Sequence, residues 1–367
     1  MRFPEPGLDR HSEDAISDAM ITGRAPRKSA GGVTMRDVAE RAGVSQMTVS
    51  SILNGQGSFK ESTRNAVMKA VQDLGYTPNL AARRLASAES DRIGVLLLTP
   101  ATPFMVSVVT AAVEASGDLA AQLQIERWTN LTDAFLAVRK LIAAGTRGIL
   151  VPPPLSASTQ LLDMISASGA IPISIAPGGN PPEKHSCVWM DDCAAAREMT
   201  AWLIGMGHRR IAFITGASDH ASSDLRLEGY RIAMSEAGLA QDCQIVTEGD
   251  YKWKSGIEAA ELLLSSSDRP TAIFASNDDM AAAVLSHAHG KGISVPGELS
   301  VVGFDDTILA TSVWPQLTTV RQPIREMVEL GAGMLLKEMH TRRKAPKPVH
   351  RKLDFTIVTR ESAAPPR

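Results

Sequence analysis

Several features that would indicate an enzyme or a metal site are missing from this sequence. The chain has only three cysteines and no CxxC pair, which argues against a disulfide framework and against a zinc site. It has no Walker loop, HExxH or GxSxG motif, and the carboxylates of Asp278-Asp279 and Asp305-Asp306 belong to adjacent residues that do not share a face. We therefore expect no catalytic residues, no metal and no cofactor.

Long apolar runs are also absent. No stretch reaches the length that spans a bilayer, and the acidic N-terminal residues contain no apolar signal-peptide core. A chain of 367 residues with 44% hydrophobic residues can form two or three domains with sizeable cores. The sequence thus predicts a cytoplasmic protein that makes no membrane contact.

The most informative segment that is present spans residues 33–54 and predicts two short helices joined by a tight turn. Gly43 supplies the turn, and Ser45 is placed to cap the second helix. The inner faces would be formed by Val38, Ala39 and Ala42 on the first helix and by Val49, Ile52 and Leu53 on the second. Gln46, Met47, Ser50 and Ser51 would point outward, where a recognition helix meets base edges. The alternative is a helical hairpin with no role in DNA binding.

Further segments flank this predicted helix-turn-helix. Residues 1–32 are polar and predict a flexible extension, and residues 62–75 predict a third helix that Gly75 ends. Residues 79–87 predict a helical segment too short to fold alone, as expected of a linker that orders on a partner. The region is mildly basic, which supports DNA binding only weakly.

From residue 92 onward, short apolar strands alternate with longer amphipathic helices. We expect strands at 93–98, 148–151, 171–176, 210–214, 272–275, 299–304 and 355–359. Helices are expected at 104–115, 132–143, 192–206, 225–237, 254–265 and 280–291. Such alternation predicts parallel sheets covered by helices on both faces, and its length favours two doubly wound lobes with a cleft between them.

Several motifs, in this order, resemble those of the LacI/GalR family of transcriptional regulators over residues 33–361. They include Asp37-Val-Ala-Glu-Arg-Ala-Gly-Val-Ser45, Leu74-Gly-Tyr-Thr-Pro-Asn79, Ser276-Asn-Asp-Asp-Met280 and Val301-Val-Gly-Phe-Asp-Asp306. The resemblance implies an all-α helix-turn-helix head and an α/β body built like a periplasmic sugar-binding protein. It also implies a homodimer that binds a near-palindromic operator in double-stranded DNA.

The resemblance extends to individual DNA-contacting residues. It implies contacts from Thr34, Met35, Ser45, Gln46, Met47, Thr48, Ser50, Ser51, Asn54, Tyr76, Asn79, Ala82, Arg83 and Leu85. Leu85 would be the apolar wedge that enters the minor groove and kinks the duplex. Ser51 stands where many members carry arginine, and Gln46-Met47 is an unusual pair, so the operator sequence does not follow from the family.

A second group of residues is expected to bind a small effector in the cleft. Arg226 opens a predicted helix and can donate several hydrogen bonds, while Asn277 and Asp305 follow predicted strands, where open α/β sheets bind ligands. For Asn277 or Asp305 alone, helix capping is the alternative role. Tyr251, Trp253 and Trp314 are candidate stacking platforms, and Phe104 and Gln322 complete the set. A sugar fits these groups best.

The predicted organisation has five parts. They are an extension (1–32), a DNA-binding domain (33–78), a hinge helix and linker (79–92), an effector-binding and dimerisation domain (93–361) and a tail (362–367). The effector domain is divided into lobe 1 (93–190 and 320–348) and lobe 2 (191–319 and 349–361). We expect a repressor of carbohydrate uptake or catabolism genes. The alternatives are a solute-binding protein without a DNA role and a regulator that answers to a non-sugar corepressor or a partner protein.

Overall fold

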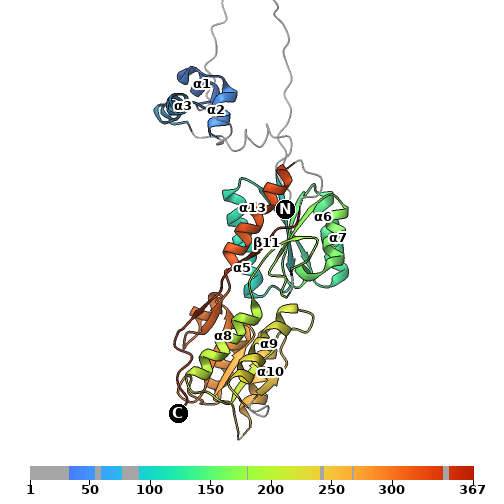
Figure 1. The fold of residues 1–367 in the computed structure, drawn as a ribbon, viewed down its shortest axis with the longest axis vertical. Helices are drawn as coiled ribbons and strands as arrows, with labels where there is room; N and C mark the ends of the chain where they lie inside the picture. Colours follow the sequence, from blue (N-terminus) through green and yellow to red (C-terminus); the bar gives the residue numbers. More distant parts are fainter. Residues whose placement is uncertain are drawn as a thin grey trace, which may run out of the picture. The chain divides into compact units, whose positions relative to one another are not determined.

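The computed structural model describes residues 33–53, 59–76, 91–179, 181–239, 244–266, 268–341 and 347–367. The chain divides into two compact units, Met1–Ala86 and Ser87–Arg367 (Figure 1). Among the described residues, no helix is long and apolar enough to cross a membrane. The predicted extension at 1–32 lies outside the described residues, and so does the helical segment expected at 79–87.

The first unit contains the three predicted helices, α1 (Met35–Ala42), α2 (Gln46–Leu53) and α3 (Glu61–Leu74). Thr34 and Asp37 form a capping box at the start of α1, which satisfies backbone N–H groups that the helix leaves unpaired. Gly43 adopts a φ of +65° and turns the chain toward α2, and the Ser45 hydroxyl accepts a hydrogen bond from the backbone N–H of Thr48. A small core holds the three helices together through Val38, Ala39, Val49, Ile52, Val67, Ala70 and Tyr76.

The second unit has two lobes, each with a six-stranded sheet. The first sheet has the order β11-β5-β4-β3-β1-β2 and is parallel throughout. Its strands are β1 (Arg92–Leu98), β2 (Gln122–Trp128), β3 (Gly148–Val151), β4 (Ile171–Ile175), β5 (Ser186–Trp189) and β11 (His350–Lys352). Helices α5 (Pro103–Asp118) and α13 (Ile324–His340) cover one face, while α6 (Leu131–Ala143) and α7 (Thr159–Ala167) cover the other (Figure 1).

The second lobe repeats this arrangement with the strand order β12-β10-β9-β8-β6-β7. Its strands are β6 (Ile211–Ile214), β7 (Gln244–Thr247), β8 (Ala272–Ala275), β9 (Ser300–Asp305), β10 (Thr318–Arg321) and β12 (Thr356–Val358). Only β12, among the described strands, runs antiparallel to its neighbour. Its helices are α8 (Asp192–Gly205), α9 (Ala221–Glu236), α10 (Trp253–Leu264), α11 (Asp278–Gly290) and the short α12 (Ile308–Ser312). Helices α8 and α9 pack on one face, and α10 and α11 pack on the other.

The chain passes between the lobes three times, after β5, after β10 and after β11. Two predicted boundaries need correction. Strand β10 pairs with β9, so the first part of lobe 2 extends through Arg321 and not only to residue 319. Strand β11 pairs with β5, so residues 350–352 belong to lobe 1 and not to lobe 2. All three side chains of β11 are polar and exposed, which left no hydrophobic signal for the strand.

The predicted tail at 362–367 is packed against the second lobe. The Ser362 hydroxyl is buried and donates to the carbonyl of Val301, and the Ala364 N–H donates to the Ser300 hydroxyl. The carbonyl of Ala364 also lies 3.0 Å from Nε2 of the buried His208. These residues therefore form part of the lobe, although their sequence, Ser-Ala-Ala-Pro-Pro-Arg, has no hydrophobic periodicity that predicts packing.

Helices α8 and α9 approach each other closely at Gly229. A Cβ atom at this position would lie 2.2 Å from the Cys193 carbonyl oxygen and 2.8 Å from the Arg197 nitrogen. Both obstacles are backbone atoms, which cannot move without separating the helices. Glycine is therefore required here by packing and not by backbone conformation.

We expect Gly229→Ala to lower the free energy of unfolding by about 1–3 kcal/mol, because the methyl group overpacks the helix interface. Urea denaturation of the full chain would measure the change. Gly205→Ala is the matched control, since Gly205 ends α8 and has no atom near its missing Cβ. If the two variants were equally stable, the close approach would not be a packing constraint.

Candidate functional site

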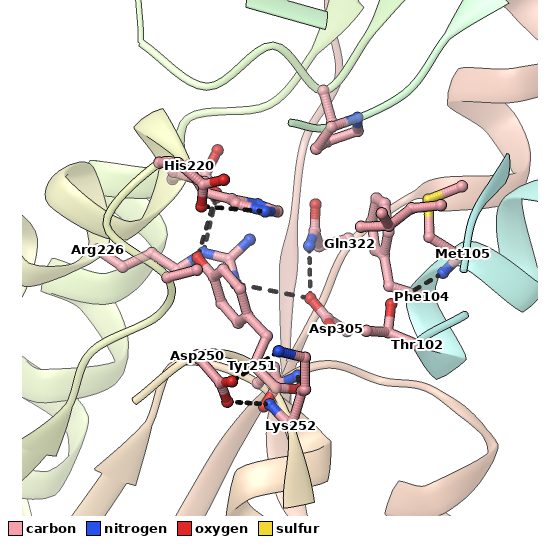
Figure 2. A pocket seen from close by; sticks show the side chains of 18 of the residues that line it. Thr102, Phe104, Met105, His220, Arg226, Asp250, Tyr251, Lys252, Asp305 and Gln322 are labelled. Atoms are coloured by element: carbon pink, nitrogen blue, oxygen red, sulfur yellow. Dashed lines mark hydrogen bonds and ion pairs between the residues drawn. The ribbon is translucent and has the colours of Figure 1, made fainter. Parts of the chain in front are cut away.

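A cavity of about 190 Å³ lies where the carboxyl ends of strands from both sheets meet (Figure 2). Parallel sheets bind ligands at this edge, because successive loops converge there. Lobe 1 contributes lining residues from the ends of β1, β3 and β4 and from the start of α5, among them Leu98, Thr102, Phe104, Pro153 and Ala176. Lobe 2 contributes Asp192, Asp219, His220, Ser222, Arg226, Asp250, Tyr251, Lys252, Asn277 and Asp305, and the second crossover contributes Gln322.

Arg226 is the most tightly held of these side chains. Its Nε donates to Asp192 Oδ1 at 2.9 Å, and its Nη1 donates to the Ser276 carbonyl at 2.5 Å. Nη1 also lies 3.7 Å from Asp305 Oδ1, and the guanidinium lies over the Phe304 ring, 3.7 Å from its centroid. Both Arg226 and Asp192 are buried, so this pair is shielded from solvent.

Asp305 connects the end of β9 to the second crossover. Its Oδ1 accepts a hydrogen bond of 2.6 Å from Gln322 Nε2, and both residues are buried (Figure 2). Burial raises the pKa of Asp305 to about 8, although the neighbouring Arg226 lowers it. A ligand hydroxyl that donates to this carboxylate would favour its ionised form.

Asn277 and Tyr251 hold each other in place. The Asn277 side chain caps α11 by accepting from the Met280 N–H, and its Nδ2 donates to the Tyr251 carbonyl at 2.9 Å. Tyr251 has a φ of +66°, and its ring occupies the space where a Cβ at Gly216 would lie. The tyrosine ring also lies 5.0 Å from the His220 ring, so lobe 2 presents an aromatic wall to the cavity.

All six residues predicted to bind the effector line this one cavity: Phe104, Arg226, Tyr251, Asn277, Asp305 and Gln322. Helix α9 begins at Ala221, so Arg226 lies in its second turn and does not open the helix as expected. Two predicted stacking residues are excluded, because Trp253 and Trp314 are exposed and do not line the cavity.

Sequence reasoning missed several lining residues, chiefly Asp192, His220, Asp250 and Lys252. Asp192 had a usable signal, since it follows the first crossover, at the start of the second lobe. His220, Asp250 and Lys252 lie in loops, where no periodic pattern marks a residue as facing inward.

On the head, the predicted DNA-contacting residues differ in exposure. Thr34, Ser45, Gln46 and Met47 are exposed, and Met47 is 81% exposed on the first turn of α2. Met35, Thr48, Ser50 and Ser51 are partly buried. Asn54, Asn79, Ala82, Arg83 and Leu85 lie outside the described residues.

Tyr76 has a packing role in the head. Its side chain is only 7% exposed and belongs to the apolar core of the head, while the DNA contact predicted for it stays a prediction.

Comparisons with known proteins agree with both parts of this architecture. Residues 34–79 match the family model of bacterial regulatory proteins of the lacI family, and residues 200–363 match a periplasmic binding protein-like domain. The HTH-type transcriptional regulator GalS of Salmonella typhimurium is 36% identical over 316 residues, which cover 83% of this chain and 89% of GalS. The chain belongs to the LacI family. It is therefore a DNA-binding transcriptional regulator, and the family is not enzymatic.

Two solved structures of DNA-binding regulators align with most of the chain. The complex of the transcriptional regulator CelR with cellobiose has 30% identity and a TM-score of 0.68, and the match covers 90% of this chain and 99% of that one. The Lac repressor dimer bound to operator and the anti-inducer ONPF has 26% identity and a TM-score of 0.65, with coverages of 91% and 100%.

The buried Arg226 network predicts how a substitution would depend on pH. Arg226→Met leaves Asp192 and Asp305 buried without their counter-charge, which should cost about 3–5 kcal/mol of stability at a pH where both carboxyls are ionised. Burial already raises the pKa of both carboxyls above the unfolded value, so their ionisation opposes folding as pH rises. Without Arg226 these pKa values rise further, so the cost of the substitution should be largest above pH 8, where Asp305 is ionised in the unsubstituted protein, and should shrink as pH falls through the folded-state pKa values of the two carboxyls.

Urea denaturation of the full-length variant at several pH values would measure this cost. Arg197→Met is the control, because the Arg197–Glu236 pair also joins α8 to α9 but is about half exposed on both sides. Its loss should cost little, because a solvent-exposed ion pair contributes weakly to stability. A cost for Arg226→Met that is equally small, or that grows at acid pH, would contradict the buried-charge account.

Proposed function

We propose that this LacI-family regulator is a repressor of carbohydrate uptake or catabolism genes and that a sugar in the inter-lobe cavity controls its binding to the operator. The cavity itself carries the proposal. It combines hydrogen-bonding side chains such as Asp305 and Gln322 with the rings of Tyr251, His220 and Phe104. A sugar has the same combination of hydroxyl groups and apolar C–H faces.

The names of related proteins support a sugar effector. CelR was solved with cellobiose, and the Lac repressor was solved with ONPF. Both resemble this chain across the cavity-forming lobes, since each match covers at least 90% of it.

At the DNA end, we propose that two copies of the chain bind a near-palindromic operator in double-stranded DNA. Helix α2 presents Gln46 and Met47 on its exposed first turn, where a recognition helix contacts base edges. A two-fold dimer would place two such helices in successive major grooves about 34 Å apart. Leu85 is proposed as the minor-groove wedge at the centre of the operator.

We propose that a change in the angle between the two lobes couples sugar binding in the cavity to DNA binding by the head. Lobe 1 approaches lobe 2 at Gly178, where a Cβ atom would lie only 2.7 Å from the Ser222 nitrogen at the start of α9. Ser222 and Ala176 also line the cavity, so this approach lies next to the proposed sugar. A ligand shifts the lobe angle only by its different affinity for the two arrangements.

Removing residues 1–86 tests whether the first unit binds DNA and the second unit binds the sugar. The full chain should select a palindromic sequence from random DNA, and the shortened chain should bind that sequence no better than random DNA. Thermal-shift assays with D-galactose, D-ribose and cellobiose should give equal stabilisation of both proteins, because the cavity lies wholly in the second unit. Specific operator binding by the shortened chain would contradict the assignment, and the failure of every sugar to stabilise either protein would contradict the proposed effector.

The lobe contact can be tested by Gly178→Ala. The added methyl group meets the Ser222 backbone, so the variant should bind the stabilising sugar more weakly, by about five- to 150-fold. The sugar should also lose its effect on operator binding in a gel-shift assay. Gly169→Ala is the control, because Gly169 also has a positive φ but has open space around its missing Cβ. Equal sugar binding by the two variants would show that this contact does not govern closure.

A further inference from the structure

We infer that the cavity accepts an uncharged sugar and excludes phosphorylated sugars and sugar acids. This inference rests on the proposed function, because it concerns the chemical class of the same effector. It follows from the charged side chains that line the cavity. The cations Arg226 and Lys252 are each paired with a carboxylate, and carboxyl groups outnumber these cations.

The strongest cation at the cavity is already engaged by the protein. Arg226 is 5% exposed, its Nε and Nη1 donate to Asp192 and Ser276, and its flat face is covered by Phe304. A ligand phosphate would compete with Asp192 and Asp305 for the charge of this guanidinium. Displacing either carboxylate would leave it buried without its counter-charge.

The other two basic side chains offer little more. Lys252 Nζ donates to Asp250 Oδ2 at 2.7 Å, so its charge is neutralised within the cavity wall (Figure 2). His220 lies 3.9 Å from Asp219, and burial together with the nearby Arg226 lowers its pKa. The imidazole is thus mainly neutral near pH 7.

Carboxylates outnumber the permanent cations among the lining residues. Asp192 and Asp250 are paired with Arg226 and Lys252, and Asp305 lies 3.7 Å from the same Arg226 and has a raised pKa of about 8, whereas Asp219 has no permanent cation. An anionic ligand would therefore meet the negative charge of Asp219 and no permanent cation that lacks a carboxylate partner. Such a wall repels a phosphate or carboxylate and still accepts hydrogen bonds from hydroxyl groups.

Helix N-termini near the cavity are also occupied by acidic residues. An exposed helix N-terminus is a common phosphate-binding element. Helix α8 has Asp191 and Asp192 at its start, α9 has Asp224 in its first turn, and α11 has Asp278 and Asp279. Helix α5 has no acidic residue there, but the Thr102 hydroxyl accepts from the Met105 N–H. The positive ends of α8, α9 and α11 are thus already compensated, whereas α10 has no acidic residue in its first turn and follows the cavity residue Lys252.

The test is calorimetric titration of the full-length protein with three sugar pairs. They are D-glucose and D-glucose 6-phosphate, D-galactose and D-galactose 1-phosphate, and D-ribose and D-ribose 5-phosphate. We expect at least one neutral sugar to bind, and its phosphorylated partner to bind at least about 100-fold more weakly, since like-charge contacts cost several kcal/mol. The ratio of the dissociation constants of the phosphorylated and the neutral sugar should fall at high salt, because ions screen charge repulsion but do not relieve a steric clash.

Asp250→Asn gives the electrostatic reason a separate test. The substitution frees Lys252 and removes one negative charge, so the ratio of the two dissociation constants should fall by about three- to tenfold. Asp268→Asn is the control, because Asp268 is an exposed carboxylate paired with Arg210 and does not line the cavity. The Asp268→Asn variant should give the same ratio of dissociation constants as the unsubstituted protein.

The outcomes separate this inference from the proposed function. A phosphorylated sugar that binds as well as its neutral partner, or better, would overturn the inference and leave the sugar effector in place. A ratio that neither Asp250→Asn nor salt changes would also overturn it, because the exclusion would then be steric. If none of the six compounds bound, the sugar effector itself would be contradicted, and this inference would fall with it.

Discussion

The buried ion pair between Arg226 and Asp192 is the constraint on which the body of this regulator depends. A guanidinium at this depth is stable only while its charge and hydrogen bonds are matched, and the structure matches them with Asp192, Asp305 and the Ser276 carbonyl. These partners come from three separate elements, namely the start of α8, the end of β9 and the end of β8. One side chain on α9 thereby ties the carboxyl ends of β8 and β9 to the start of α8.

The same carboxylates connect this edge to the crossovers between the lobes. Asp192 directly follows the first crossover, and Asp305 accepts from Gln322 on the second. The third crossover is tied to the first, because Lys352 donates to Asp191 at 2.8 Å and also lies near the Trp189 ring. Groups that face the cavity are therefore bonded directly to crossover residues, as Asp305 is to Gln322. A ligand that takes over the hydrogen bond of Asp305 would release that contact with the second crossover.

The sequence alone predicts those helices and strands that are marked by a periodic apolar pattern or by a motif. The three head helices and the buried strands β1, β3, β8 and β9 were predicted, because apolar spacing and glycine turns specify them locally. Strand β2 was missed because its sequence, QLQIERW, is largely polar at the sheet edge, and α13 was missed although its apolar residues are buried. The burial of Tyr76 and the engagement of Arg226 by Asp192 could not be predicted, since both depend on residues distant in the chain or on tertiary packing.

Helix α13 shows how this network reaches the part of the body that carries the head. The helix begins two residues after Gln322 and ends at His340, whose Nε2 lies 2.8 Å from Asp91 Oδ2. Asp91 immediately precedes β1, and the head lies N-terminal to it in the chain. The helix also packs along β3, β4 and α5, so it is held as part of the first lobe over its whole length. The crossover that meets the cavity and the start of the first strand of the body are therefore joined by one helix that packs on the first lobe.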